Sequence, residues 1–402
     1  MRTLASLALA AGLLATGCHS GISYDGDLGK PIKAELHDDV VFIEVEVGDA
    51  EPQLLGVDTG APETVLDPHV FADQGVKSGV GTIGLGFGGL TFDDVPYWGL
   101  EFCAPGQCGS QDVVGLVGGG LLKDFEASFD YRAPSLTLGT PELPAGLQTA
   151  DSIDFSLEGG GASQVGSDKT DVPPTRIVLT ATVEGKELTL VLDAGASLVV
   201  LDSTVFASLT ADGRPTADAE AATESGIQDS KVARSRSIKL GKSEVAGAPI
   251  FSAPAGLLDD LAGEVGHSVD GLLGGTFLRE FLVSVDYPNS VVELRRYDSR
   301  DHIHDQYIRV ALAIGPVDDS ADTSYGVTQI FPDSDVSADP DSACFGLVTS
   351  VDGTKLAGLG VEAADTLLRG AAGESRTLEI ESMCSAATFT KTFVVKDVLA
   401  LP

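Results

Sequence analysis

Alternating apolar and polar residues predict two similar β-strands in distant parts of the chain. Residues 41–47 alternate in this way, and residues 177–183 repeat the pattern. This alternation is typical of strands that bury one face. The chain has 48 glycines and few aromatic residues, which favours many turns between short strands. The pattern therefore predicts a mainly β protein.

An internal repeat of two ordered motifs organises the chain. Segment 115–131, GLVGGGLLKDFEASFDY, matches segment 271–287, GLLGGTFLREFLVSVDY, with nine of seventeen positions identical. A second pair of motifs, GVDTGA at 56–61 and VLDAGA at 191–196, precedes the two copies in the same order. Two motifs repeated in one order predict two homologous lobes.

The repeat and the composition around it suggest where the parts begin and end. We predict one lobe over residues 30–145 and the other over residues 172–297. Residues 156–174 are rich in Gly, Ser, Asp and Pro, which predicts a linker between the lobes. The charged segment 298–305 leads into residues 306–402, which lack both motifs and are predicted to form a small β-rich module with one helix.

The first residues indicate export. Residues 1–17 carry Arg2 and an apolar run that is too short to span a bilayer, as in a signal peptide. The run ends in small residues directly before Cys18, which resembles the lipobox of bacterial lipoproteins. That resemblance implies lipidation of Cys18 and a membrane anchor in the cell envelope, with the outer membrane favoured because His19 follows. An ordinary signal peptide with a chance cysteine is the alternative.

The chain is strongly acidic. It has 60 acidic and 25 basic residues, so its formal net charge is −35. A negative field of this size repels nucleic acid and anionic lipid, so we expect no nucleic-acid partner. High net charge also favours solubility.

The remaining cysteines fit an oxidising compartment. Apart from Cys18 there are four, which form two candidate disulfides: Cys103 with Cys108, and Cys344 with Cys384. A zinc site fits less well, because no histidine stands at ligand spacing from either pair. We expect neither a metal nor a cofactor.

The repeated motifs resemble those of aspartic peptidases of the pepsin and retropepsin clan. The first lobe has Asp58-Thr59-Gly60-Ala61 and, later, Leu116-Val117-Gly118. The second lobe has Asp193-Ala194-Gly195-Ala196 and, later, Leu272-Leu273-Gly274. The resemblance implies a two-lobed acid-protease fold over about residues 35–297, in a monomer with pseudo-twofold symmetry. It also implies that Asp58 and Asp193 form the catalytic pair.

The resemblance implies a role for each motif residue. Two carboxylates in contact share one proton and activate a water between them. The supporting residues are then the loop glycines Gly60 and Gly195, the strand-end glycines Gly118 and Gly274, and Thr59, whose hydroxyl bonds to the opposite lobe. Ala194 departs from the family pattern and removes one hydroxyl, a hydrogen bond worth about 1 kcal/mol.

Two functions follow from these motifs. The first is an envelope-anchored aspartic endopeptidase acting on peptides or proteins. The second is a catalytically degenerate lipoprotein that binds extended peptides or protein C-termini. Ala61, Ala196 and Glu63 would line the substrate cleft, although Glu63 as an exposed turn carboxylate is equally open.

The second lobe is predicted to carry the larger flap over the cleft. Its spacing from Asp193 to Gly274 is 274 − 193 = 81 positions, against 118 − 58 = 60 in the first lobe. The extra residues lie within 207–237, and a flap there would have Gly226 near its tip. A disordered loop is the alternative interpretation.

The C-terminal module resembles bacterial PDZ domains in two segments. One begins with Tyr325-Gly326-Val327, and the other is GLVTSVDG at 346–353. The resemblance implies a PDZ-like α/β module that binds a peptide C-terminus by strand addition at Tyr325, Gly326 and Val327. A capping β-domain without a ligand is the alternative.

Overall fold

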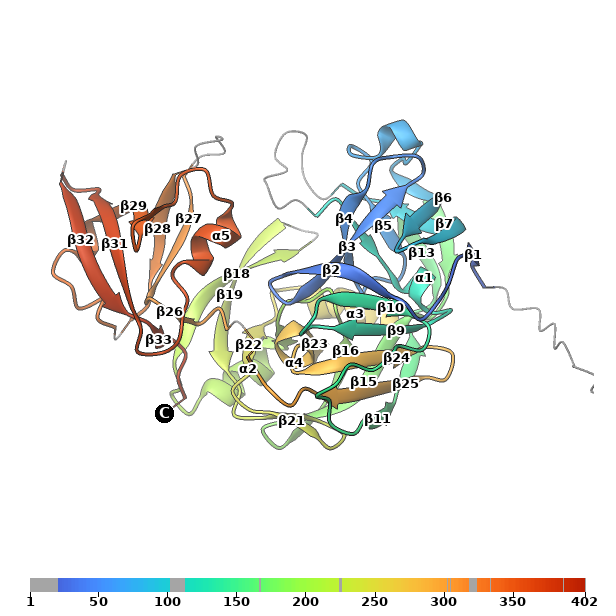
Figure 1. Cartoon of the computed structure of the whole chain (residues 1–402). Helices are drawn as coiled ribbons and strands as arrows, with labels where there is room; N and C mark the ends of the chain where they lie inside the picture. Colours follow the sequence, from blue (N-terminus) through green and yellow to red (C-terminus); the bar gives the residue numbers. More distant parts are fainter. Residues whose placement is uncertain are drawn as a thin grey trace, which may run out of the picture.

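The computed structural model describes most of the chain beyond the N-terminal segment. The residues described are 21–401, except 102–112, 166–167, 224–225, 302, 304, 318–323, 333 and 386. The predicted signal peptide, the lipidation site Cys18 and the pair Cys103 and Cys108 lie outside the described residues. The fold is mainly β, as predicted, and Figure 1 shows two lobes with a smaller module beside the second.

Lobe 1 is one strongly curved sheet around an apolar core. Its first strand, β1, pairs with β7. The lobe therefore begins before residue 30, which is the start that we predicted. Its elements are β1 (Ser23–Asp25), β2 (Pro31–His37), β3 (Val40–Val47), β4 (Gln53–Val57), β5 (Thr64–Leu66), η1 (Ala72–Gln74), β6 (Gly79–Phe87), β7 (Leu90–Gly99), β8 (Gly115–Val117), α1 (Gly119–Leu122), β9 (Glu126–Asp130) and β10 (Ser135–Leu138).

Lobe 2 repeats this arrangement with additional elements. It contains β15 (Arg176–Val183), β16 (Lys186–Leu192), β17 (Val199–Leu201), α2 (Ser203–Thr210), β18 (Thr216–Thr223), β19 (Gly226–Arg234), β20 (Ile238–Leu240), β21 (Ser243–Val245), β22 (Pro249–Ser252), α3 (Leu257–Val265), β23 (Gly271–Leu273), α4 (Gly275–Leu278), β24 (Phe281–Asp286) and β25 (Val291–Arg296).

The two copies of the repeat pair with each other at the junction of the lobes. Strand β9 runs antiparallel to β24, and Ser128 is the register partner of Ser284. Their hydroxyls are 2.7 Å apart and buried. Because these two serines occupy equivalent positions of the repeat, the pseudo-twofold axis passes between them. Strands β2, β10, β9, β24, β25 and β11 (Asp151–Asp154) form the sheet that joins the lobes.

The segment predicted as a linker is largely folded. Strand β12 (Ser156–Glu158) pairs with β15 of lobe 2. Strands β13 (Gly161–Val165) and β14 (Asp168–Val172) form a hairpin beside β6 of lobe 1, where Asp168 Oδ2 accepts from the Val80 amide at 3.3 Å. The prediction failed because these strands are short and polar and draw part of their support from a distant strand.

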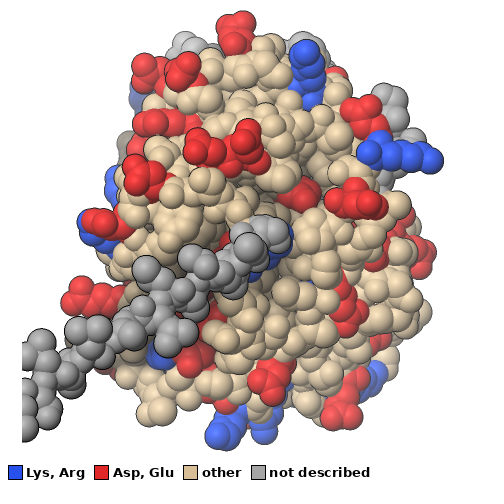
Figure 2. All heavy atoms as spheres, turned by 90° about the vertical axis from the view of Figure 1, so that its right-hand side faces the viewer, with Lys and Arg blue, Asp and Glu red and all other residues tan. Residues whose placement is uncertain are grey.

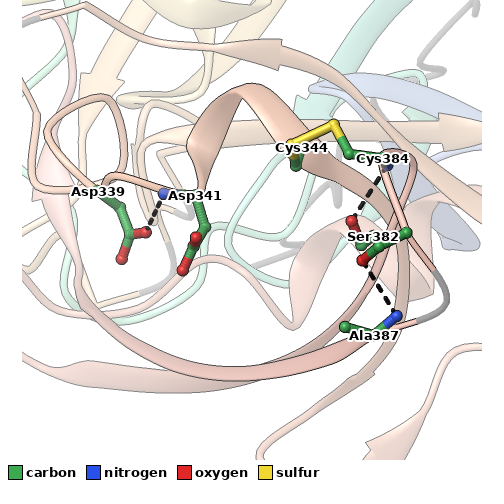
Figure 3. Close-up of a disulfide and its surroundings, with 7 residues drawn as sticks. Asp339, Asp341, Cys344, Ser382, Cys384 and Ala387 are labelled. Atoms are coloured by element: carbon green, nitrogen blue, oxygen red, sulfur yellow. Dashed lines mark hydrogen bonds between the residues drawn. A yellow bond between two sulfur atoms is a disulfide. The ribbon is translucent and has the colours of Figure 1, made fainter.

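The C-terminal module is an antiparallel sheet with one short helix. It contains β26 (Ile308–Arg309), β27 (Leu312–Pro316), β28 (Tyr325–Ile330), η2 (Ser342–Cys344), β29 (Phe345–Val351), β30 (Thr354–Lys355), α5 (Val361–Thr366), β31 (Ser375–Ser382), β32 (Thr388–Val394) and β33 (Lys396–Asp397). The predicted disulfide between Cys344 and Cys384 is present, joining the segment before β29 to the one after β31 (Figure 3).

The edge at which we expected a peptide to add is already paired. Strand β28 lies between β27 and β29, with Gly326 opposite Gly315 on one side and Leu347 on the other. Helix α5 packs against β27. A peptide therefore cannot add at Tyr325, Gly326 and Val327 while β27 is in place. The sequence motif did not reveal this, because the segment that forms β27 precedes the residues that resemble a PDZ domain.

The module packs on the β18–β19 hairpin of lobe 2. One buried apolar cluster contains Ala217 and Val232 of the hairpin together with Val310 and Leu312 of the module. The side-chain amide of Gln329 also donates, through Nε2, to the Asp218 carbonyl at 3.2 Å. Lobe 2 and the module therefore share one buried apolar cluster. Within the part of the chain that the structure describes, no helix is long and apolar enough to cross a membrane.

Candidate active site

The fold brings Asp58 and Asp193 face to face. A Cβ built on Gly60 would lie 2.6 Å from the Asp193 carboxyl carbon, and one built on Gly195 would lie 2.3 Å from that of Asp58. Each carboxyl group thus packs on the loop glycine of the opposite lobe. Only glycine leaves room for this close approach, which explains both predicted glycines.

Backbone amides hold the two carboxyl groups in equivalent ways. Asp58 Oδ1 accepts from the amides of Gly60 at 2.7 Å and Ala61 at 3.0 Å. Asp193 Oδ1 accepts from the amides that follow it at 2.9 and 3.0 Å, those of Gly195 and Ala196. Ala61 and Ala196, which we predicted to contact substrate, therefore lie in the loops that hold the two carboxyl groups, the candidate catalytic loops.

A strand ending in glycine supports each loop. Strand β8 runs parallel to β4, and β23 runs parallel to β16. A Cβ on Gly118 would lie 2.0 Å from the Glu63 carbonyl, and one on Gly274 would lie 2.2 Å from the Leu198 carbonyl. The chain segment that follows each Asp loop therefore leaves no room for a side chain at the predicted strand-end glycines.

The cross-lobe hydroxyl contacts exist on one side only. Thr59 Oγ1 donates to the Leu192 carbonyl at 2.9 Å and accepts from the Ala194 amide at 2.9 Å. Thr59 is fully buried. Ala194 has no hydroxyl to make the symmetric pair of contacts with Val57 and Thr59. The hydroxyl of one side chain, instead of two, therefore joins the two loops by hydrogen bonds.

Electrostatics in the pair favour a shared proton. Burial raises the pKa of Asp193 well above its ordinary value, and the negative charge of Asp58 and a hydrogen bond with it raise the pKa further. The positive charge of Arg176 acts in the opposite direction. One carboxyl group therefore stays protonated at a pH where an isolated aspartate has ionised. Such a pair can act as base and acid at once.

Arg176 is a site residue that sequence reasoning missed. It begins β15, where lobe 1 has Val40 at the equivalent position, and its side chain is 11% exposed. Its guanidinium donates to the Gly60 carbonyl in the catalytic loop and pairs with Glu264 on α3. The sequence signal for this residue is an arginine in the second repeat at the position where the first repeat has a valine.

Replacing Arg176 by Met is expected to shift the pH dependence of kcat/KM to higher pH. A cation near the pair stabilises its ionised forms, so removing the cation raises the pKa of Asp193 and moves both limbs of the profile upward. The measurement is a pH–rate profile beside Arg236→Met, an arginine whose side chain is 48% exposed. If both limbs of the pH–rate profile stayed at the same pH in Arg176→Met, Arg176 would have only a structural role.

Glu63 lies in a cavity next to the catalytic loop. Its side chain is 5% exposed, so the exposed-turn interpretation is wrong. Burial raises the pKa of Glu63 to about 7, against the opposing charge of Lys123. The cavity has a volume of about 270 Å³ and is lined by Glu63, Val80, Gly81, Thr82, Pro96, Tyr97, Trp98 and Thr170.

The segment predicted as a flap forms a hairpin in lobe 2. Every residue of β18 pairs with β19, and Gly226 opposes Thr223 next to the turn. The strands therefore favour the flap over the disordered loop. The two lobes can be compared strand by strand. Val47 pairs with Leu85 in lobe 1, and Val183 pairs with Ile238 at the equivalent place in lobe 2, so the end of β6 corresponds to β20. Among the described residues, lobe 1 has no strand that corresponds to β18, and the β13–β14 hairpin lies beside β6 instead.

A family match agrees with this site. A sequence model of the family described as Aspartyl protease matches residues 179–277, which include Asp193 and Gly274. Comparison with curated proteins found no match. Among solved structures, the aspartic proteinase from Irpex lacteus is similar at a TM-score of 0.42 and 15% identity, over 68% of this chain and 99% of that chain. The family match and the paired loops define an aspartic peptidase fold. Among the described residues, no cluster of potential metal ligands is present.

Proposed function

We propose that the protein is an aspartic endopeptidase that hydrolyses peptide or protein substrates with a water held between Asp58 and Asp193. The observation that supports this most is the pair of carboxyl groups, each packed on the loop glycine of the other lobe. The ionised member takes a proton from the water while the protonated member donates to the carbonyl oxygen of the peptide bond. No covalent intermediate forms, and the pair regains one shared proton when the amine leaves.

The cleft has elements that would hold an extended peptide. The β18–β19 hairpin of lobe 2 would act as the flap, with Gly226 near its tip. Ala61, Ala196 and Glu63 would line the cleft beside the pair. We expect the chain to work as a monomer, because both halves of the site are present in one chain.

The test is digestion of a random peptide library by the chain from residue 19 onward, between pH 3 and pH 8. We expect cleavage that a statine-containing peptide, an analogue of the tetrahedral intermediate, suppresses. Folded protein that cleaves nothing at any pH would overturn the peptidase proposal. Tight binding of the statine peptide without cleavage would instead favour a degenerate binder.

Ala194 supports the second candidate function, a non-catalytic peptide-binding protein, and gives a direct test. Ala194→Thr is expected to restore the second cross-lobe contact, raise kcat and stabilise the protein by about 1 kcal/mol. Ala194→Val is the matched control, because valine has nearly the same shape without the hydroxyl. Equal effects of Thr and Val on kcat would show that the missing hydroxyl does not limit an active pair.

We also propose that the protein is anchored in the cell envelope, in the outer membrane, through a lipid on Cys18. The lipobox-like sequence before Cys18 supports this. Labelling with a radioactive fatty acid in expressing bacteria tests it. The label is expected in the wild type, in the outer-membrane fraction, and absent from Cys18→Ala. A wild-type protein without label would contradict the anchor.

A further inference from the structure

The cavity beside Glu63 is built from three separate parts of the chain. Glu63 forms one wall, and the paired strands β6 and β7 of lobe 1 form the second. Thr170, on the β13–β14 hairpin between the lobes, forms the third. At about 270 Å³ the cavity has room for one long side chain. The inter-lobe hairpin thus completes a compartment that lobe 1 alone would leave open.

The Glu63 carboxylate at this cavity has one oxygen without a hydrogen-bond partner among the described residues. Glu63 Oε2 is buried and makes no hydrogen bond. Lys123, the nearby cation, pairs with Asp124 at 3.1 Å. A Cβ on Gly120 would lie 1.8 Å from Glu63 Oε2, so the absence of a side chain at residue 120 leaves the carboxylate its place. A buried carboxylate is costly unless a cation or donor reaches it.

Lobe 2 has no acidic residue at the corresponding position. Glu63 stands five residues after Asp58, and the residue five after Asp193 is Leu198. The two halves of the site therefore differ in charge. A peptide lying across both lobes would meet a carboxylate on one side of the scissile bond and a leucine on the other.

We propose that this cavity is a specificity subsite that takes a lysine or arginine side chain of the substrate. The aliphatic stem would pack along the part of β7 that lines the cavity, Pro96 to Trp98, and the cationic head would pair with Glu63. The inference rests on the proposed peptidase function and deepens it, because it names the substrate class. The cavity lies beside the Asp58 loop, because the Glu63 carbonyl is against Gly118, the strand-end glycine that supports that loop.

The experiment compares matched peptides that carry Lys, Arg, Met or norleucine at each position around a cleaved bond. At one position on one side, the wild type is expected to prefer Lys or Arg over norleucine by at least about ten-fold in kcat/KM, the equivalent of 1.4 kcal/mol. Glu63→Gln is expected to lose that preference and still cleave. Glu142→Gln, the same change at an exposed residue, is the control and should keep it.

A second variant tests the inter-lobe hairpin. Thr170→Lys would place an ammonium group in the cavity, so it is expected to remove the preference for basic side chains while norleucine peptides are still cleaved. Thermal unfolding shows whether each variant is folded. Cleavage without a basic preference at any position, or a preference unchanged in Glu63→Gln, would overturn the inference and leave the peptidase proposal standing.

The selectivity should also depend on pH. The titratable groups beside Glu63 are Lys123, at the end of α1, and Tyr97, on β7, while β6 and β14 line the cavity with neutral residues. Burial raises the pKa of Glu63 to about 7, so the free carboxylate is neutral below that pH and charged above it. The ratio of kcat/KM for Lys and norleucine peptides cancels the titration of the catalytic pair. It is expected to rise between pH 5 and 8 in the wild type only.

A complete lack of cleavage would count against the proposed function, and the subsite is then tested by binding. Fluorescent peptides with Lys or norleucine are titrated into wild type and Glu63→Gln at pH 8. Tighter binding of the Lys peptide in wild type alone would support the subsite. Equal dissociation constants for the two peptides would overturn it.

Discussion

Replacing either Asp58 or Asp193 by Asn is expected to lower kcat by about 10²–10⁴-fold. Asparagine keeps the shape of the side chain and can still accept from the loop amides, but it can neither take nor give the proton that the pair exchanges with water. Both substitutions should therefore act alike, because the two carboxyl groups form one titrating unit. The measurement is kcat on a peptide identified from the library digest.

Asp193→Asn is also expected to remove a loss of stability that the wild type undergoes between acid and neutral pH. The pKa of Asp193 is raised in the folded state, so the folded protein holds a proton that the unfolded chain has already lost. Wild-type stability therefore falls as the pH rises from the unfolded pKa to the folded pKa, and Asp193→Asn avoids that loss. Urea unfolding at pH 4 and pH 7 measures the difference.

Asp202 supplies the matched control for the Asn substitutions. It caps helix α2 by accepting from the amides of Thr204 and Val205. Asparagine caps helices about as well as aspartate, so Asp202→Asn should leave both stability and kcat nearly unchanged. If Asp58→Asn lost stability and activity together, the carboxyl pair would be structural instead of catalytic.

The sequence predicted the parts of the fold that the repeat encodes. The positions shared by the two copies make equivalent contacts. Ser128 contacts Ser284 across the junction, and Gly118 and Gly274 each lie against the backbone of their own lobe. Such contacts require the same residue type twice, so they leave a visible signal. The β13–β14 hairpin is not repeated, and part of its support comes from β6. No local pattern reports that contact.

The site divides in the same way. The Asp, Thr and Gly residues of the loops follow from the motifs, whereas Arg176 has no motif and reaches Gly60 from another lobe. For Glu63 the sequence left burial and exposure equally open, because its exposure depends on Thr170 and the β6–β7 strands closing over it. The prediction that a peptide adds a strand at Gly326 failed for a related reason, because β27 already pairs with the strand that contains Gly326.

An ion network centred on Arg234 holds the module to both lobes. Arg234, the last residue of β19, pairs with Asp305 at 2.8 Å and Asp397 at 2.7 Å, and its side chain is 6% exposed. Asp305 is also 4.0 Å from Arg279, which pairs with Asp39 of lobe 1. Burial opposes ionisation of Asp305, but the hydrogen bond and charge of Arg234 outweigh it and lower the pKa of Asp305.

Arg234→Met is therefore expected to lower the free energy of unfolding at pH 7 by about 3 kcal/mol, because it removes the cation that pairs with Asp305, whose side chain is 14% exposed, and with the half-buried Asp397. Arg236→Met, at an exposed arginine two residues away, should cost less than about 1 kcal/mol. Since the pKa of Asp305 is lowered in the folded protein, its contribution is present above its unfolded pKa and is lost as the pH falls through the folded value. The difference between wild type and Arg234→Met should therefore shrink in acid. A difference that stays constant with pH would mean that Arg234 acts by packing alone, and the β18–β19 hairpin would then owe its position to the shared apolar cluster.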